Sequence, residues 1–274
     1  MKTPTFSIII PTLNEEKFLP HLLDSLVVQT DKDFEVIVVD GSSQDKTVAR
    51  AHTFASRLPK LTVIVSTKAS LPLQRNLGAK KASGDWLVFM DADVLCMPYF
   101  MDRMEAYISR EKTSVFTTWF QPDSNIVNDA FFTLLANLVL EGSLLIKRPI
   151  TPGPLTVIRS DVFGAIGGYD ESHAFNEDIE FGLRLLKKGF HETILRETLY
   201  IWSMRRIRNE GKMKYVNQII LAAFPILFMK QPLKYMPGYA MGGHMYDTKN
   251  KRIKPSVMKQ MQSKLKNLMK ELIE

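Results

Sequence analysis

Acidic residues recur where predicted strands end or predicted helices begin. Asp91 and Asp93 follow Trp86–Met90, a short apolar run that predicts a buried strand. Glu177 and Asp178 form a second acidic pair, at the start of a predicted helix. Carboxylate oxygens suit Mg²⁺ or Mn²⁺, which complete their coordination with water or substrate phosphates. These residues therefore indicate metal-assisted chemistry on a phosphate-bearing substrate, although Asp-x-Asp alone also fits an ordinary solvated strand end.

Two further positions could contact a nucleotide. Asp40 ends the apolar run Phe34–Val39 and precedes Gly41–Ser43, whose small side chains allow a close backbone approach. An acid there can accept hydrogen bonds from a ribose or a base. The alternative is a plain strand-to-helix loop in which Asp45 caps the next helix. Arg75 would supply planar donors to a phosphate or a carboxylate.

The elements that position these residues alternate between strand and helix. Apolar runs at 6–10, 34–39 and 61–65 predict strands, the first ended by Pro11, and helical spacing lies between them. This alternation predicts an α/β fold with a mostly parallel, Rossmann-like central sheet, right-handed crossovers and flanking helices. Later elements are also predicted: helices over 99–110 and 178–188, and strands over 114–119 and 156–158.

Several stretches bear on membranes. Residues 126–146 are apolar, which fits either a helix buried in the core or an interfacial helix that meets lipid. Residues 216–229 form the longest uncharged run, and 255–274 repeat apolar residues at helical spacing with lysines between them. No run approaches the roughly 18 apolar residues of a membrane span. With a net charge of +7 and a pI near 9.3, these stretches predict a basic, helical extension over 211–274, after a catalytic domain over 1–210.

Other chemistries are disfavoured by missing motifs. The sequence has no P-loop, no Gly-x-Gly-x-x-Gly after its first strand, and no Gly-x-Ser-x-Gly elbow. It has no Cys-x-x-Cys or His-x-x-x-His pair, so a zinc site is not expected. The single cysteine, Cys96, rules out an intrachain disulfide and fits a structural thiol better than a nucleophile. The basic residues follow no nucleic-acid-binding module, so nucleic acid is not an expected partner.

Taken in series, the motifs resemble those of the family 2 glycosyltransferases with the GT-A fold. The resemblance extends from the N-terminus to about Arg208. It rests on five segments: SIIIPTLNEE (7–16), VVDGSSQD (38–45), QRNLG (74–78), FMDAD (89–93) and NED (176–178).

The resemblance implies a role for each matching residue. It places the donor nucleotide on Pro11, Thr12, Asn14, Glu15, Asp40, Arg75, Asp91 and Ala92, with Arg205 and Arg206 near its diphosphate. Asp93 would hold Mg²⁺ or Mn²⁺. Asp178, beside Glu177 in the catalytic pair, would be the general base of an inverting transfer. Its place at a helix start favours the ionised form.

The resemblance also implies a donor. It would be a nucleotide sugar, with a UDP-sugar favoured over GDP-mannose. The Gln-x-x-Arg-Trp motif of processive members is missing, which predicts transfer of a single sugar. The apolar stretches 126–146 and 216–229 and the basic tail predict an acceptor that is lipid-linked or a glycan, and peripheral contact with the membrane. The single cysteine fits a cytoplasmic location. Two alternatives stay open: a nucleotide-sugar-binding protein without turnover, and a sugar-nucleotide pyrophosphorylase, for which the Gly-rich loop after the first strand is missing.

Overall fold

The computed structural model describes residues 4–173, 175–205 and 208. Its elements in chain order are β1 (Phe6–Thr12), α1 (Leu19–Val27), β2 (Phe34–Asp40), α2 (Thr47–His52), β3 (Leu61–Val65), α3 (Leu71–Lys81), β4 (Trp86–Met90), β5 (Val94–Cys96), α4 (Phe100–Arg110), β6 (Val115–Pro122), α5 (Val127–Leu145), β7 (Leu155–Arg159), α6 (Ser160–Ile166), α7 (Glu177–Lys187) and β8 (Glu192–Trp202). The predicted strand at 61–65 and the strand at 86–90 have these same bounds.

The strands of the described part form one sheet in the order β3-β2-β1-β4-β7-β6-β8-β5. β1 pairs in parallel with β2 and β4, and β2 with β3, as the alternation of strands and helices predicts. β6 and β8 are also parallel, but β7 runs antiparallel to both β4 and β6, and β5 runs antiparallel to β8. The α/β prediction is therefore confirmed, while the sheet is mixed beyond β4.

The predicted end of the first strand is wrong. β1 continues through Pro11 to Thr12 and stays paired with β2 along its whole length. Its pairing with β4 stops at Ile9. Proline is tolerated at Pro11 because one side of the strand has no ladder partner there.

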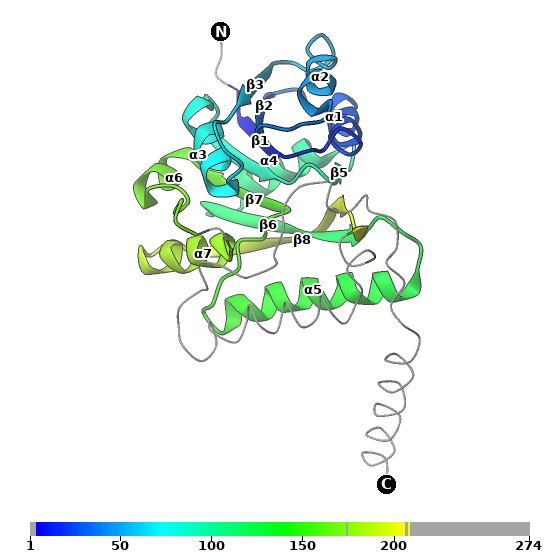
Figure 1. Cartoon of the computed structure of the whole chain (residues 1–274). Coiled ribbons are helices and arrows are strands. Elements are labelled where there is room, and N and C mark those ends of the chain that lie inside the picture. The colour runs from blue at the N-terminus through cyan, green and yellow to red at the C-terminus, as the bar shows by residue number, and fades with distance from the viewer. Residues whose placement is uncertain (1–3, 174, 206–207, 209–274) are drawn as a thin grey trace, which may run out of the picture.

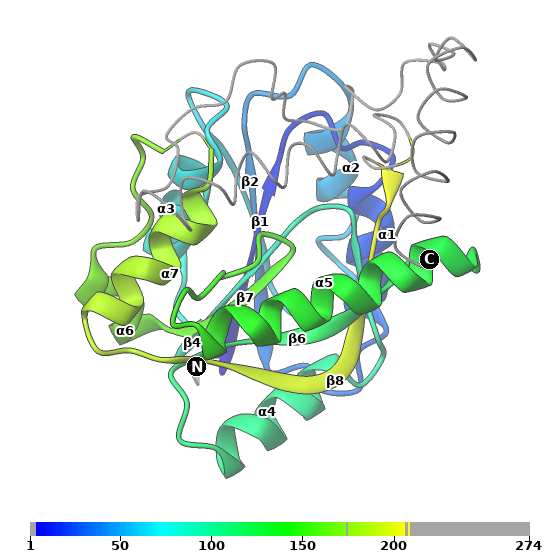
Figure 2. The same ribbon diagram turned by 90° about the horizontal axis from the view of Figure 1, so that it is seen from below.

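Helices cover both faces of the sheet, as Figures 1 and 2 show. One face packs against α1, α2 and α4, and the other against α3, α6 and α7. Alternate strand residues enter the two cores, with Ile8 and Ile10 on one side and Ile9 on the other. Burial on both faces explains why these strands read as continuous apolar runs.

Strand direction decides where the functional residues meet. From the pairings, the carboxyl ends of β1, β2, β4, β6 and β8 lie at one edge of the sheet, together with the start of β7. This edge is where open α/β sheets bind their ligands. It collects the segments that follow Thr12, Asp40, Met90 and Trp202, although they lie far apart in the sequence.

The helix predicted over 126–146 is present as α5, but it is not buried in the core. It lies along the outside of the sheet, against β6 and β8 (Figure 2), and its outward side chains are apolar and exposed. No helix of the described part is long and apolar enough to cross a membrane. The predicted stretches 216–229 and 255–274 lie outside the described residues.

Candidate active site

The acidic loop after β4 contacts Arg205, a residue that lies shortly after the end of β8. Val94 pairs with Trp202, so Asp93 lies beside the segment that follows β8. Arg205 Nε lies 3.0 Å from Asp93 Oδ2, and its two terminal nitrogens donate to both carboxylate oxygens of Glu15 at 2.9 and 2.6 Å. The three side chains are at most 13% exposed. The Arg205 guanidinium therefore pairs with Asp93 and with Glu15 at the same time.

Burial changes the charge balance of this cluster. It raises the pKa of Asp93 to about 7, against the lowering effect of Arg205. It also raises the pKa of Glu15, although Arg205 opposes that shift as well. One guanidinium thus faces two buried acids, with Asp91 adding further negative charge to both. The cluster retains an affinity for additional positive charge.

Arg75 joins the two acidic pairs of the sequence. It lies inside α3 and is 1% exposed. Its guanidinium reaches Glu177 Oε1 at 3.1 Å and Asp91 Oδ1 at 3.4 Å, and it stacks 5.0 Å from the centre of the Tyr169 ring. The structure uses this arginine to fix two carboxylates relative to one another. Its predicted place near the donor's base and diphosphate stays a prediction.

Glu177 and Asp178 begin α7, as predicted, but the expected electrostatics are wrong. Burial raises the pKa of Glu177 to about 7, with the neighbouring Asp178 adding to the shift. Burial also raises the pKa of Asp178, because desolvation outweighs the hydrogen bond from Ile179 N to Asp178 Oδ1 at 2.8 Å. Removal from water, rather than the helix start, dominates here, and it makes Asp178 a stronger base. Asn176 stands at the N-cap with φ 55° and without a side-chain cap bond.

A loop that the motif series did not single out completes this edge. Gly153 O accepts a hydrogen bond from Arg75 Nη2 at 3.2 Å, and Thr151 donates its hydroxyl to the backbone oxygen of Asp178. A Cβ on Gly153 would lie 3.4 Å from Arg75 Nη2 and 3.6 Å from an Asp91 oxygen. Residues 149–154 therefore lie between the two acidic pairs. Their only sequence signal is the clustering of proline and glycine before β7.

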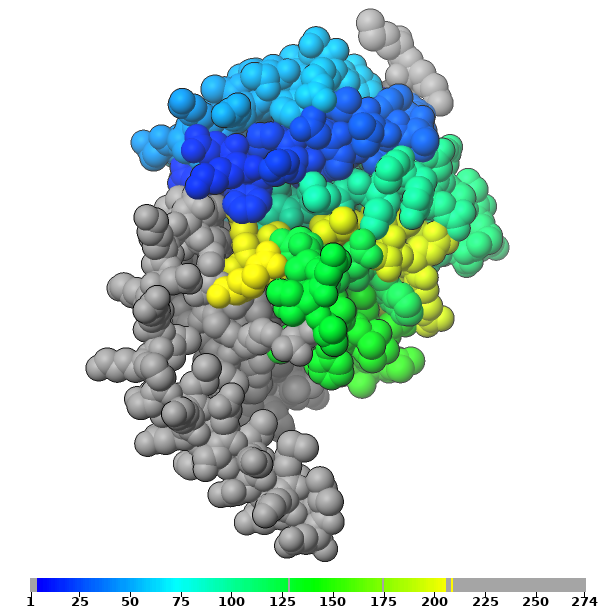
Figure 3. Space-filling view, turned by 90° about the vertical axis from the view of Figure 1, so that its right-hand side faces the viewer, coloured from blue at the N-terminus to red at the C-terminus, as the bar shows by residue number. Residues whose placement is uncertain are grey.

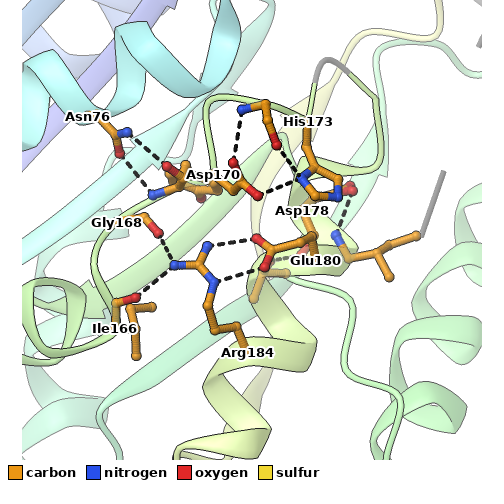
Figure 4. A network of polar contacts seen from close by, with 12 residues as sticks. Asn76, Ile166, Gly168, Asp170, His173, Asp178, Glu180 and Arg184 are labelled. Carbon is orange, nitrogen blue, oxygen red and sulfur yellow. Dashed lines mark hydrogen bonds and ion pairs between the residues drawn. The ribbon is translucent and has the colours of Figure 1, made fainter. Parts of the chain in front are cut away.

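A second polar network anchors the loop that leads to α7 (Figure 4). Asn76 pairs with both the N–H and the C=O of Tyr169 at 2.9 Å, and Arg184 donates to the carbonyls of Ile166 and Gly168 at 2.7 and 2.6 Å. Arg184 also pairs with Glu180, one turn earlier in α7. Helix α7 is thereby tied through Arg184 to the end of α6, and the loop before α7 is tied through Asn76 to α3.

The predicted donor-binding loops lie at the same edge. Asp40 is fully buried and accepts hydrogen bonds from Thr12 Oγ1 at 3.0 Å and from Ser43 N at 2.8 Å. Asn14, with φ 54°, accepts a bond from Gln44 N at 2.7 Å. Asp40 therefore organises the loops after β1 and β2. Pro11, Thr12 and Ala92 are buried beside them, and Arg206 lies outside the described residues.

The carboxylate of Asp93 fits a divalent cation that takes its remaining ligands from substrate phosphates or water. Among the described residues, no three acidic, histidine or cysteine side chains form a metal cluster. Asp93 offers a carboxylate that is paired with the Arg205 guanidinium. Mg²⁺ and Mn²⁺ are commonly held by one or two carboxylates together with substrate phosphates. The chemistry of Asp93 matches that arrangement.

Comparisons with known proteins agree with this geometry. The model of a family described as "Glycosyl transferase family 2" matches residues 7–167. A "PGL/p-HBAD biosynthesis glycosyltransferase" of Mycobacterium bovis is 35% identical over 188 residues, which cover 67% of this chain and 70% of that protein. An "Uncharacterized glycosyltransferase" of Haemophilus influenzae is 29% identical over 187 residues, covering 66% of this chain and 62% of its own length.

Solved structures share the fold. Staphylococcus aureus TarS in complex with UDP-GlcNAc superposes with a TM-score of 0.60 at 22% identity, over 73% of this chain and 58% of TarS 1-349. The mannosyltransferase PcManGT of Pyrobaculum calidifontis, in complex with GDP-Man and Mn²⁺, gives 0.61 at 18% identity, over 81% and 65%. The chain thus spans about six tenths of several of these relatives. The family match covers more than half of the chain, and the chain belongs to glycosyl transferase family 2.

Proposed function

We propose that this protein transfers one sugar from a nucleotide diphosphate donor to an acceptor hydroxyl, with inversion at the anomeric carbon. One observation carries the proposal. Arg75 holds Asp91 of the acidic loop and Glu177 of the later pair on a single guanidinium, at the ligand-binding edge of the sheet. This contact supports the proposal because it joins the acidic loop, which we propose to bind metal and phosphate, to the acidic pair that would supply the base, in a chain of glycosyl transferase family 2.

The chemical step follows from these roles. The acceptor oxygen attacks the anomeric carbon and forms the new glycosidic bond, while its proton passes to the Asp178 carboxylate. The bond from the anomeric carbon to the diphosphate breaks, and the nucleoside diphosphate leaves with the electron pair. Attack opposite the leaving group inverts the anomeric centre. The burial that raises the pKa of Asp178 strengthens it as the acceptor of this proton.

The developing charge on the leaving diphosphate needs compensation. A divalent metal on Asp93 would supply Lewis-acid stabilisation of those oxygens. Arg205 is already present beside Asp93 and would donate to the diphosphate once released from Glu15. Asp40 and Thr12 keep the loops after β1 and β2 in place for the base and ribose. Glu177, whose pKa is about 7, positions Arg75.

The neighbours support a nucleotide-sugar donor without deciding its identity. The TarS structure holds UDP-GlcNAc, and the PcManGT structure holds GDP-Man with Mn²⁺. We propose a UDP-sugar as donor, with GDP-mannose as the competitor to test. The names of relatives, among them PGL/p-HBAD biosynthesis and poly(ribitol-phosphate) transfer, favour an acceptor in the cell envelope, either lipid-linked or a glycan.

A thermal-shift panel with a turnover assay tests the proposal. The panel contains UDP- and GDP-sugars with Mn²⁺, with Mg²⁺ and with EDTA, since a ligand at about 100 times its Kd stabilises the folded state by about 2.7 kcal/mol. Release of UDP or GDP reports turnover. We expect Asp93→Asn to lose the metal-dependent shift and Asp178→Asn to keep it. The control is Asp161→Asn, an exposed acid paired with Arg159.

The outcomes separate the candidate activities. A metal-dependent shift for one nucleotide class, with turnover lost in Asp178→Asn, supports a transferase. Binding without turnover on any acceptor would favour a nucleotide-sugar-binding protein. Formation of a nucleotide sugar from nucleoside triphosphate and sugar phosphate would favour a pyrophosphorylase. No shift with any nucleotide would refute the donor site itself.

A further inference from the structure

Helix α5 turns polar side chains toward the protein and apolar side chains toward solvent, which is the opposite of an ordinary surface helix. Its inward side chains include buried Asp129, Thr133, Asn137 and Ser143, each at most 6% exposed. Its outward side, here called the α5 face, consists of apolar residues that are 47–85% exposed: Val127, Phe131, Leu134, Leu135, Leu138 and Leu145. Their spacing of three, four and seven residues places them on one side of the helix.

The inward polar residues are satisfied, so the reversal is built into the packing. Asn137 accepts from Phe120 N at 3.3 Å and donates to Phe120 O at 2.9 Å, which fixes α5 on β6. Thr133 and Ser143 bond to backbone oxygens of the preceding turn. The helix therefore cannot turn its apolar face inward without breaking the two Asn137 bonds to Phe120. An exposed apolar stripe of this length indicates a surface made for an apolar medium or partner.

Charge around the helix favours an anionic partner. Of the two acids between residues 126 and 148, Asp129 is buried, and Glu141 is 19% exposed and paired with Arg196 at 2.8 Å. Lys147 is exposed just beyond the C-terminal end of α5. Neither carboxylate of the helix thus adds an uncompensated negative charge beside the apolar stripe.

The chain leaves the described part at the other end of the same helix. Arg208 lies 3.7 Å from Asp129, in the first turn of α5, and donates to Asp123 at 2.5 Å. Figure 3 shows the end of β8, in yellow, against the green of α5. The remaining 66 residues, 209–274, contain twelve lysine or arginine residues and four acidic ones. A strongly basic segment therefore follows a residue that lies at the first turn of α5.

We propose that the α5 face binds an anionic lipid bilayer, lying in the plane of its surface. An anionic bilayer accounts for the apolar stripe and for the adjoining basic segment together, whereas an apolar protein partner accounts for the stripe alone. The 19-residue helix is about 28 Å long, but it lies on the membrane because no helix of the described part is suited to span one.

This inference rests on the proposed function and deepens it by making the acceptor lipid-linked. Leu145, at the end of the α5 face, is six residues before Thr151, which binds the backbone of Asp178. A hydroxyl carried at the bilayer surface would therefore reach the proposed base along the loop that follows α5.

Vesicle flotation of the full chain tests the inference. The probes are phosphatidylcholine vesicles with and without 40% phosphatidylglycerol, a mixture chosen for its anionic charge. The test variant is Leu134→Ser with Leu138→Ser, which are 54% and 53% exposed. The matched control is Val28→Ser with Val65→Ser, both 58% exposed and far from α5 in the sequence. We expect the wild type and the control to bind anionic vesicles, and the test variant to partition at least tenfold less.

Three results would overturn the inference. They are equal flotation of the test and control variants, failure of the wild type to bind vesicles, and a wild-type dimer that Leu134→Ser with Leu138→Ser dissolves. The same proteins are examined for nucleotide-dependent thermal shifts, which the α5 substitutions should leave unchanged. Failure of the wild type to bind vesicles, with its nucleotide-dependent shift intact, would refute the membrane face alone. Vesicle binding by a wild type that shows no nucleotide-dependent shift would refute the donor site alone.

Discussion

Removing the Arg205 guanidinium should make the nucleotide-free protein bind Mn²⁺ more tightly. In the structure this cation lies against Asp93 and bridges to Glu15, and it stacks 4.0 Å from the Phe18 ring centre. We expect a divalent metal on Asp93 to compete with the guanidinium for Asp93 Oδ2 and to repel it by charge. Metal binding without nucleotide would then have to displace Arg205, and Arg205→Gln removes that competition.

The size of the effect of Arg205→Gln follows from the burial of Arg205, Asp93 and Glu15. Leaving a buried charge without its partner costs roughly 3–5 kcal/mol, and proton uptake by Asp93, whose pKa is about 7, relieves part of this. We expect Arg205→Gln to lose about 2–3 kcal/mol of stability at pH 8. A change of 1.4 kcal/mol in binding free energy corresponds to a factor of ten in affinity. Because Mn²⁺ binding regains part of the lost stability, the Mn²⁺ affinity of Arg205→Gln should be at least tenfold higher than that of the wild type.

Titration of Mn²⁺ followed by electron paramagnetic resonance, without nucleotide, measures the affinity directly. Thermal unfolding with and without Mn²⁺ gives a second readout, in which the metal should restore more stability to Arg205→Gln than to the wild type. Arg103→Gln is the matched control, because its pair with Glu197 is 46% and 32% exposed and such pairs contribute little. An Mn²⁺ affinity in Arg205→Gln equal to or weaker than that of the wild type would refute the reasoning.

Three further predictions concern the base, its neighbour and the thiol. Asp178→Asn should reduce turnover by roughly 10²–10⁴ while donor binding persists, and wild-type turnover should rise with pH through a pKa above the ordinary aspartate value, as a pH–rate profile would show. Because the pKa of Glu177 rises from 4.5 to about 7 on folding, the folded state binds the proton more tightly than the unfolded chain does. The free energy of unfolding should therefore fall as pH rises from 4.5 to 7, and urea titrations should show that Glu177→Gln flattens this slope. Cys96 is buried with its pKa raised to about 12, so a thiol reagent at pH 8 should modify it only on unfolding, and rapid labelling of the folded protein would contradict its burial.

Local patterns were enough to predict the parts of the site that follow strands directly. The acids after β2 and β4 could be placed at the ligand-binding edge because the runs 34–39 and 86–90 are buried on both faces. The pair at the start of α7 was equally visible, since the apolar face of that helix has clear helical spacing. The family resemblance then assigned roles that spacing alone left open.

The long-range contacts could not be predicted in this way. Arg75 pairs with Glu177 across 102 residues, and Arg205 with Glu15 across 190, and no local signal specifies either partner. β8 was missed because Glu192, Arg196 and Glu197 interrupt its apolar residues, and β5 is only three residues long. For α5, apolar composition predicted the helix but not its orientation, which depends on Asn137 bonding to β6.

The pairing of β5 with β8 also bears on the order in which parts of the protein fold during synthesis. In the described part, β5 has β8 as its sheet partner, so the strand after the acidic loop stays unpaired until the ribosome has made residue 202. The crossovers of β1 to β4 are local by comparison and can form much earlier. A nascent chain would therefore carry a folded half, β1 to β4, in which Arg75 already pairs with Asp91 but Asp93 still lacks Arg205, and Arg205 would join it among the last steps. Substitutions that weaken β8 should then lower the yield of folded protein more than they lower the stability of the finished chain.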